Sequence, residues 1–222
     1  MSELSLFAAD AAGHLVEGLN PQQRAAVEYR GQSLLIVAGA GSGKTRVLTH
    51  RVAHLIRTGV SPFEILAITF TNKAAAEMRE RAKGLIGRDA RHVVICTFHA
   101  LGVRMLREDG VAVGLKPEFS ILDSDDVLSL LRDAGATTDA KLARQWQWGI
   151  SLWKNHGLDS EGAAAVAQND LERVTARVMK LYEDRLQAYQ AVDFDDLIGL
   201  PLRLLQRDET VRLKWQDRFH HV

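Results

Sequence analysis

Short apolar runs alternate with segments of helical periodicity in the first half of the chain. The runs at 33–37, 65–70 and 93–97 are rich in apolar and β-branched residues and predict buried parallel strands. After each run, apolar residues recur every three to four positions, which indicates helices that begin near residues 44, 72 and 98. Strands alternating with helices predict an α/β fold with an open parallel sheet of three strands.

The pattern changes at about residue 107, where the apolar runs stop and the chain becomes helical. Helical spacing marks five later segments: 123–131, 141–154, 171–191, a stretch that starts at 193–197, and 209–219. Turns rich in Gly and Asp separate the first three of them. The second half of the chain is therefore predicted to contain no further strand.

One more helix is predicted ahead of the first strand. Asn20 is a good N-cap and Pro21 suits the first helical position, so a helix should reach about Tyr29. Gln23 lies in its first turn, where its amide could pair with an adenine edge. The alternative is a solvated side chain. Residues 1–17 are expected to form a loose arm or a short helix.

Composition is ordinary for a globular protein of 222 residues, with 46% hydrophobic and 25% charged residues. No apolar run approaches the roughly eighteen residues of a membrane span, and the N-terminus lacks the pattern of a secretory signal. The single cysteine, Cys96, lies in an apolar run and is expected to be a small buried hydrophobe. Because no intrachain disulfide is possible, a reducing cytoplasmic setting is favoured.

Charge is unevenly divided along the chain, although the formal net charge is zero. Residues 1–106 carry 13 Lys and Arg against 8 Asp and Glu, a net charge of +5. Residues 107–222 carry 15 against 20, a net charge of −5. The basic half also contains the glycine-rich segment AGAGSGKT. An anionic partner is therefore favoured for that half.

The segment AGAGSGKT joins the first predicted strand to the next helix. Its residues are Ala38, Gly39, Ala40, Gly41, Ser42, Gly43, Lys44 and Thr45. Glycines let successive N–H groups turn toward phosphate oxygens, with the positive end of the helix dipole behind them. Lys44 would reach the β- and γ-phosphates of ATP, and the Thr45 hydroxyl would ligate Mg²⁺. Position 38 holds alanine instead of the usual glycine, a mild change. The alternative is a glycine-rich turn without a ligand.

Polar residues follow the second and third predicted strands. Ligands of open parallel sheets bind at the carboxyl ends of the strands, which places both segments at one edge with the glycine-rich loop. Short polar side chains at this edge suit contacts with phosphate: Thr69, Thr71, Asn72, Thr97 and His99. Phe70 and Phe98 end apolar runs, so the residues alone favour a core position for both.

Two other clusters could bind metal. Asp193, Asp195 and Asp196 are more simply a helix start, with Asp193 as N-cap and Asp196 three residues on. His50 and His54 lie one helical turn apart, the spacing of a zinc pair, but no third ligand is evident. They are therefore expected to be partly buried helix residues.

Tryptophans cluster in the segment 141–154. Trp146, Ile150 and Trp153 share one helical face and are expected in the core of the helical half. Trp148 falls off that face, with Lys154 near it, and the alternative is a DNA-contacting edge.

Five motifs together resemble the superfamily 1 DNA helicases of the UvrD, Rep and PcrA group, with Rep the most similar. They are LNPQQ at 19–23, AGAGSGKT at 38–45, TFTNKAA at 69–75, TFHALG at 97–102 and DFDDL at 193–197. The resemblance covers nearly all of the chain after residue 18. It implies a RecA-like P-loop NTPase fold in three parts: an arm at 1–18, a partial ATP-binding motor domain at 19–106 and 193–222, and an all-helical insertion at 107–192.

The resemblance also implies roles for single residues. Gln23 would read adenine, Arg46 would pack against the base, and Lys44 and Thr45 would act in catalysis on phosphate and Mg²⁺. The contacts with single-stranded DNA would come from Thr69, Phe70, Thr71, Asn72, Lys73, Thr97 and His99. The resemblance makes Phe70 an exposed surface for base stacking, whereas Phe98 is still expected in the core.

The implied function is the ATP-binding part of a 3′-to-5′ DNA helicase that moves on single-stranded DNA and at duplex junctions, in replication or repair. The family's acidic pair for Mg²⁺ and water, its arginine fingers and its second motor domain are expected after Val222. The chain thus resembles a fragment without catalysis of its own. The alternatives are a nucleotide-gated module that binds single-stranded DNA and the helicase part of a helicase-nuclease.

Overall fold

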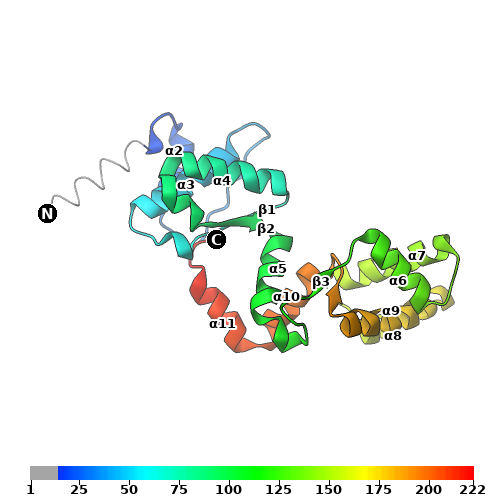
Figure 1. Ribbon diagram of the computed structural model, residues 1–222. Coiled ribbons are helices and arrows are strands. Elements are labelled where there is room, and N and C mark those ends of the chain that lie inside the picture. Colours follow the sequence, from blue (N-terminus) through cyan, green and yellow to red (C-terminus); the bar gives the residue numbers. More distant parts are fainter. Residues whose placement is uncertain (1–14) are drawn as a thin grey trace. The chain divides into compact units, whose positions relative to one another are not determined.

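The computed structural model describes residues 15–222, which divide by their contacts into two units (Figure 1). Unit 1 contains the described residues up to Thr97 together with Trp215–Val222, and unit 2 is Phe98–Lys214. Most of the arm expected at 1–18 lies outside the described residues. The expected boundaries at 106/107 and 192/193 follow the change of sequence pattern and stay a prediction. No helix within the described range is long and apolar enough to cross a membrane.

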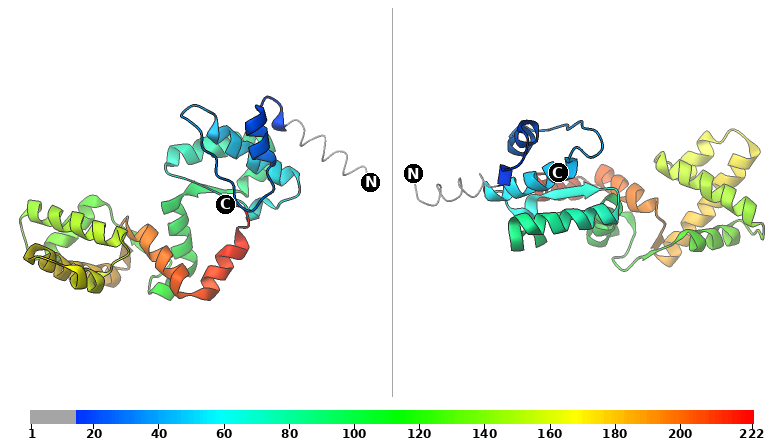
Figure 2. Two further views of the ribbon diagram at one scale, coloured as in Figure 1. Left: turned by 180° about the vertical axis from the view of Figure 1, so that it is seen from behind. Right: turned by 90° about the horizontal axis from the view of Figure 1, so that it is seen from above.

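Unit 1 is built on two parallel strands. Its elements are α2 (Pro21–Glu28), α3 (Lys44–Arg57), η1 (Pro62–Glu64), β1 (Leu66–Thr69), α4 (Asn72–Ile86), η2 (Gly87–Arg91) and β2 (Val94–Thr97). Leu66 lies opposite Val94 and Thr69 opposite Thr97, so the two strands end together. In Figures 1 and 2, α4 lies along this pair, and it contacts both strands. The strands expected at 65–70 and 93–97 and their parallel pairing are confirmed.

Helix starts in unit 1 lie where local capping chemistry predicts them. The Asn20 carboxamide accepts the backbone N–H of Gln23, and the Gln23 side chain accepts the N–H of Asn20, which forms a capping box with Pro21 in the first turn. At the start of α4, the Thr71 hydroxyl accepts the N–H of Ala74. The sequence-based starts of α2, α3 and α4 are therefore confirmed.

The strand expected at 33–37 is wrong. These residues form neither a helix nor a strand, and Leu35 and Val37 are 86% and 87% exposed. A buried strand needs hydrogen-bond partners along its edges, and none of the strands within residues 15–222 pairs with this segment. Only Ile36 packs inward, against a small cluster that includes Val27 and Val47. The sheet of unit 1 consequently has two strands instead of three.

The core of unit 1 lies between α3, α4 and the strand pair. Its buried members are Leu15, Val52, Ala53, Ile65, Ala75, Met78, Ala82, Ile86, Ala90, Val93 and Ile95. Cys96, expected to be buried, is only half-buried. Alternation along β2 explains this, because Ile95 and Thr97 take the covered face and Cys96 takes the other.

Unit 2 is mainly helical. Its elements are α5 (Phe98–Asp109), η3 (Gly110–Val113), β3 (Ser120–Ile121), α6 (Ser124–Ala134), α7 (Ala140–Asn155), α8 (Ser160–Val166), α9 (Asp170–Tyr189), β4 (Ala191–Val192), α10 (Asp196–Arg207) and α11 (Glu209–Arg218), whose last residues belong to unit 1. The helices expected in this half are confirmed. The sequence pattern missed the short α8 and the parallel pair β3–β4. Two-residue strands are too short to leave a periodic signal.

Two clusters of apolar side chains form the core of unit 2. The larger lies among α6, α7, α8 and α9, which Figures 1 and 2 show as one bundle. Trp146 and Ile150 are buried in it and Trp153 packs against it, as expected, while Trp148 is exposed. The smaller contains Leu106, Leu115, Phe119, Val192 and Leu197. Phe98, expected in the core, is 47% exposed. It shares a helical face with the buried Gly102 and Met105, but it is the first residue of α5 and lies one turn before the first of them.

Helices α5 and α10 approach each other closely at Gly102. A Cβ atom added to Gly102 would lie 1.8 Å from the Leu197 carbonyl oxygen, so only glycine fits here. The sequence motif TFHALG therefore ends on a glycine for a packing reason.

We expect Gly102→Ala to destabilise the chain by about 1–3 kcal/mol, because the new methyl group overpacks a backbone contact. Gly84→Ala is the matched control, since Gly84 is also inside a helix and an added Cβ would meet nothing within 4 Å. It should stabilise by about 0.5–1 kcal/mol. Urea unfolding measures both. Equal midpoints for the two variants would contradict the close approach.

Candidate functional site

The glycine-rich segment 38–45 forms a tight loop that ends at the first turn of α3. Gly41 and Gly43 adopt left-handed conformations, with φ of +75° and +86°, which other residues rarely adopt. Gly43 is the N-cap residue of α3 and has no side chain to cap it. The first N–H groups of a helix have no partner within the helix. The loop and the helix start thus provide donors for an anion.

The Lys44 ammonium group lies within this loop. Its Nζ donates to the backbone oxygens of Ala38 and Gly39, at 2.7 Å each. The Ser42 hydroxyl also donates to the Gly39 oxygen, at 2.7 Å. These bonds hold a positive charge at the loop. Thr45 follows in the first turn of α3 and is half-buried. The two residue types and their order suit phosphate and a phosphate-bound Mg²⁺.

Gln23 braces the loop from α2. Besides closing the capping box, its Nε2 donates to the Ser42 oxygen at 3.1 Å. Neither the adenine-reading nor the solvated interpretation predicted the bond to Ser42. The capping box could have been predicted, because Asn-x-x-Gln at a helix start is its signal. One N–H of the amide remains beyond these bonds. Adenine contacts by Gln23 and base packing by the exposed Arg46 stay predictions.

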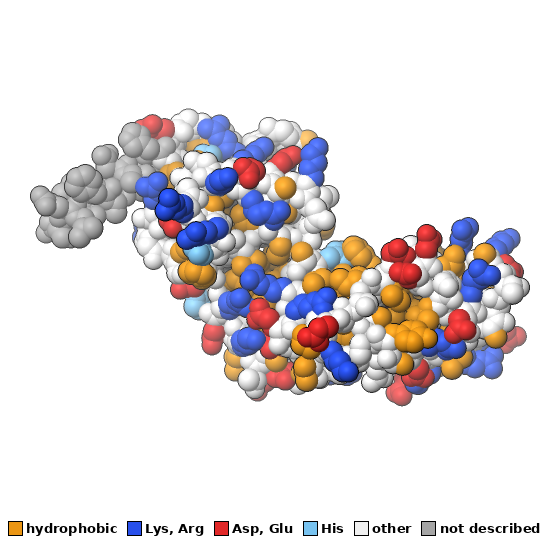
Figure 3. Space-filling model, viewed as in Figure 1, with side chains coloured by type: hydrophobic (Ala, Val, Ile, Leu, Met, Phe, Trp, Pro, Cys, Tyr) orange, Lys and Arg blue, Asp and Glu red, His pale blue; other side chains and the backbone are white. Residues whose placement is uncertain are grey.

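The carboxyl ends of β1 and β2 bring several predicted DNA-binding residues together. Thr69 and Thr97 are register partners at the two strand ends. Phe70 follows β1 and is 88% exposed, so the expected exposed position is confirmed. The Thr71 hydroxyl is used in capping α4, while Asn72 and Lys73 lie exposed in the first turn. Lys and Arg side chains are spread over the face of unit 1 in view in Figure 3.

His99 lies in unit 2, at the start of α5, and forms an aromatic pair that sequence reasoning missed. Its ring stacks on Phe194, with centroids 3.9 Å apart and planes 24° apart. Phe194 is 60% exposed although it is a large apolar residue. The available signal was its place between aspartates in DFDDL, since an apolar residue between acidic ones is often exposed at a turn. The pair presents a ring surface of the kind that stacks on bases.

The residues on both sides of Phe194 join a buried charged cluster. Lys154 Nζ lies 2.6 Å from Asp193 Oδ2 and 2.9 Å from Asp196 Oδ1, and all three residues are buried. The Tyr182 hydroxyl donates to Asp193 Oδ2 at 2.9 Å. The alternative interpretation, a DNA-contacting edge at Lys154, is therefore wrong. Its charge is used inside the unit, where two carboxylates offset the cost of burying it.

The expected N-cap at Asp193 is wrong in position, because α10 begins at Asp196. The expected bonding is present. Asp193 Oδ1 accepts the N–H of Asp196 at 2.9 Å, and Asp196 Oδ2 accepts the N–H of Asp193 at 3.2 Å. Residues 193–195 therefore lie ahead of the helix, and the carboxylates of Asp193 and Asp196 also bind Lys154.

Burial and the three charges shift the pKa values of this cluster. Burial raises the pKa of Asp196 to about 6, against the attraction of Lys154. Burial alone would also raise the pKa of Asp193, but the Lys154 ammonium and its hydrogen bond hold it below its ordinary value. Burial disfavours the charged form of Lys154, and the two carboxylates outweigh it and raise the lysine pKa.

The histidine pair on α3 has the partly buried position that was expected. His50 and His54 are both half-buried, and His50 Nδ1 lies 2.8 Å from the Arg46 oxygen. Burial lowers the pKa of His54. Within residues 15–222, no group of three or more His, Cys, Asp or Glu residues is placed to hold a metal ion.

Comparison with known proteins identifies the family to which the chain belongs. Residues 19–222 match the family model of the UvrD/REP helicase N-terminal domain. The chain therefore belongs to this family, in agreement with the resemblance carried by its motifs.

Named relatives agree with the family. The chain is 46% identical over 235 residues to "ATP-dependent DNA helicase UvrD1" of Mycobacterium tuberculosis, covering 99% of this chain and 30% of that protein. It is 46% identical over 209 residues to "ATP-dependent DNA helicase Rep" of Escherichia coli, covering 92% and 31%. It is 44% identical over 214 residues to "ATP-dependent DNA helicase PcrA" of Leuconostoc citreum, covering 94% and 29%. The chain thus spans about 30% of the length of these relatives.

The buried cluster predicts a pH dependence that Lys154→Met should reveal. Without the ammonium group, two neighbouring buried carboxylates lose the charge that lowered their pKa values, so the folded state binds a proton more tightly than the unfolded chain. The unfolding free energy of the variant should then increase as the pH falls from 8 to 5, more steeply than that of the unsubstituted chain.

The matched control is Lys180→Met, because Lys180 pairs with Asp184 at an exposed site. At pH 8 we expect Lys154→Met to cost about 3–5 kcal/mol and the control to cost much less, because its ion pair is exposed to solvent. Thermal melts across the pH range measure both effects. Parallel pH curves for the two variants would contradict the account of the cluster.

Proposed function

We propose that this chain is the ATP-binding N-terminal part of an ATP-dependent 3′-to-5′ DNA helicase that couples ATP hydrolysis to movement on single-stranded DNA. The observation that carries the proposal is the Lys44 ammonium group, held by two loop carbonyls at the start of α3 beside two left-handed glycines. The names of the relatives, all ATP-dependent DNA helicases, support it.

In this proposal the nucleotide binds at the loop 38–45. The loop N–H groups and the first turn of α3 surround the phosphates, Lys44 faces the β- and γ-phosphates, and Thr45 ligates Mg²⁺ through the bound nucleotide. Gln23 offers its remaining amide hydrogen to adenine, and Arg46 packs on the base. A RecA-like fold is part of the proposal, and the parallel unit β1–α4–β2 beside the loop helix supports it.

Single-stranded DNA binds at the carboxyl ends of β1 and β2 in the same proposal. Phe70 stacks on a base, while Thr69, Asn72, Lys73 and Thr97 contact the phosphate backbone. His99 and Phe194 add a second ring surface in unit 2. Hydrolysis, unwinding at duplex junctions and a role in cytoplasmic replication or repair are proposed for the whole protein. The single-strand binding module is the second candidate, favoured by the 88% exposed Phe70.

Lys44→Ala should abolish binding of Mg-ATP, because it removes the cation that faces the phosphates. Lys83→Ala is the matched control, since Lys83 is an exposed lysine near the end of α4 in the same unit. Titration calorimetry measures both variants against the unsubstituted chain. Unchanged affinity in Lys44→Ala would remove the loop from the proposal.

Phe70→Ala should weaken binding to a single-stranded oligonucleotide about tenfold with little change in salt dependence, because stacking releases no counterions. Lys73→Ala should instead lower the slope of log Kd against log salt by about one. Phe63→Ala is the control, since Phe63 is an exposed phenylalanine elsewhere in unit 1. Fluorescence anisotropy at several salt concentrations gives both quantities. A Phe70→Ala effect equal to that of Phe63→Ala would exclude stacking there.

A further inference from the structure

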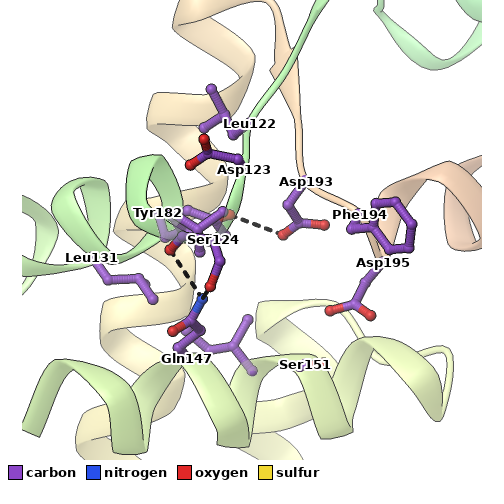
Figure 4. Close-up of a pocket in the computed structure, with 12 residues that line it drawn as sticks. Leu122, Asp123, Ser124, Leu131, Gln147, Ser151, Tyr182, Asp193, Phe194 and Asp195 are labelled. Carbon is purple, nitrogen blue, oxygen red and sulfur yellow. Dashed lines mark hydrogen bonds between the residues drawn. The ribbon is translucent and has the colours of Figure 1, made fainter. Parts of the chain in front are cut away.

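An apolar pocket lies next to the segment that carries Phe194. It has a volume of about 480 Å³ and is drawn in Figure 4. Its lining includes four apolar side chains from α6, α7 and the segment before α6, together with polar residues of the same elements: Leu122, Val127, Leu131 and Ile150, and Asp123, Ser124, Gln147 and Ser151. Asp193, Phe194 and Asp195 line another side. The segment therefore has open space beside it, and packing on that side cannot fix its position.

Phe194 could bury its ring by turning into this pocket. Transfer of an aromatic side chain from water to an apolar site is favourable by itself. The structure nevertheless has the ring 60% exposed and stacked on His99. In Figure 4 the ring lies on the opposite side of the drawn residues from Leu131. Some other interaction must hold the exposed position.

Polar bonds hold the residues on both sides of Phe194. Asp193 binds Lys154 of α7 and the Tyr182 hydroxyl of α9. Asp196 binds Lys154 and exchanges backbone bonds with Asp193. Asp195 accepts a bond from the Asn155 amide, at 3.2 Å. The segment is thus held at three aspartates, and Lys154 binds two of them.

We propose that Lys154, acting through Asp193 and Asp196, is a positioning residue that holds the Phe194 ring out of the pocket and against His99, where it stacks on a base of single-stranded DNA. The position of the ring is independent of the proposed function, whereas the DNA contact rests on it. Loss of the ammonium group releases the segment, and the ring turns into the pocket.

The position of the ring can be measured without DNA. Stacking at 3.9 Å places His99 in the ring current of Phe194 and shifts its ring protons upfield. In the NMR spectrum of the histidine-labelled chain, Lys154→Met should return the His99 signals toward the positions that they take in Phe194→Ala. Loss of the signals in His99→Gln assigns them among the eight histidines. Lys180→Met, the exposed lysine control, should leave them unchanged.

DNA affinity is measured on the same variants by anisotropy. Lys154→Met should weaken binding to a single-stranded oligonucleotide about tenfold, to the level of Phe194→Ala. The double variant Lys154→Met with Phe194→Ala should bind no worse than either single variant, because both remove the same contact.

A third variant separates positioning from folding. In Lys154→Met with Asp193→Asn and Asp196→Asn, no unpaired charge is buried, so the unit should fold. It should still show the shifted His99 signals and the weaker binding. Unchanged His99 signals in this folded variant would overturn the proposal. Should the unsubstituted chain bind no DNA, the proposed DNA contact fails, and the His99 signals still decide whether Lys154 positions the ring.

Discussion

Parallel strands depend on neighbours, and this constraint governs unit 1. β1 and β2 pair in parallel over four residue pairs, and α4 packs against both strands. Their carboxyl ends are therefore fixed side by side. That fixed edge is what places Thr69 and Thr97 together and leaves Phe70 exposed beyond them. The segment 33–37 has an equally apolar sequence but no strand partner within residues 15–222, and all of its residues except Ile36 are exposed. Pairing, more than apolar character, decides which run becomes a strand.

Local chemistry explains what the sequence predicted well. The caps at Asn20 and Thr71 and the glycine-rich loop before α3 use hydrogen bonds between residues three to six positions apart. A short stretch of sequence therefore contains both partners of each bond. The bond from Gln23 to Ser42 spans 19 residues, and the pairing of Lys154 with Asp193 and Asp196 spans about 40. Residue spacing carries no signal for such contacts. For that reason the alternative of a DNA-contacting edge at Lys154 was wrong, and the exposed Phe194 was missed.

The two units use charge in different ways. In unit 1 the Lys44 ammonium binds only backbone oxygens, so its full positive charge remains for an anion. In unit 2 the Lys154 ammonium is neutralised by carboxylates and serves the internal structure. The two lysines thus differ in their partners: Lys44 binds the dipoles of backbone carbonyl groups, and Lys154 binds the negative charges of two carboxylates. Only the first arrangement suits a phosphate ligand.

The contact of α5 with α10 at Gly102 has a mechanical consequence. Packed helices usually slide past each other through a layer of side chains that change rotamer. At Gly102 the backbone of one helix meets the Leu197 carbonyl of the other, so that layer is missing and sliding is blocked. His99 lies in the first turn of α5, and Phe194 lies just before α10. Shear between the two helices is therefore opposed close to both rings, whereas the segment of Phe194, which lies ahead of α10, is held by its own polar bonds.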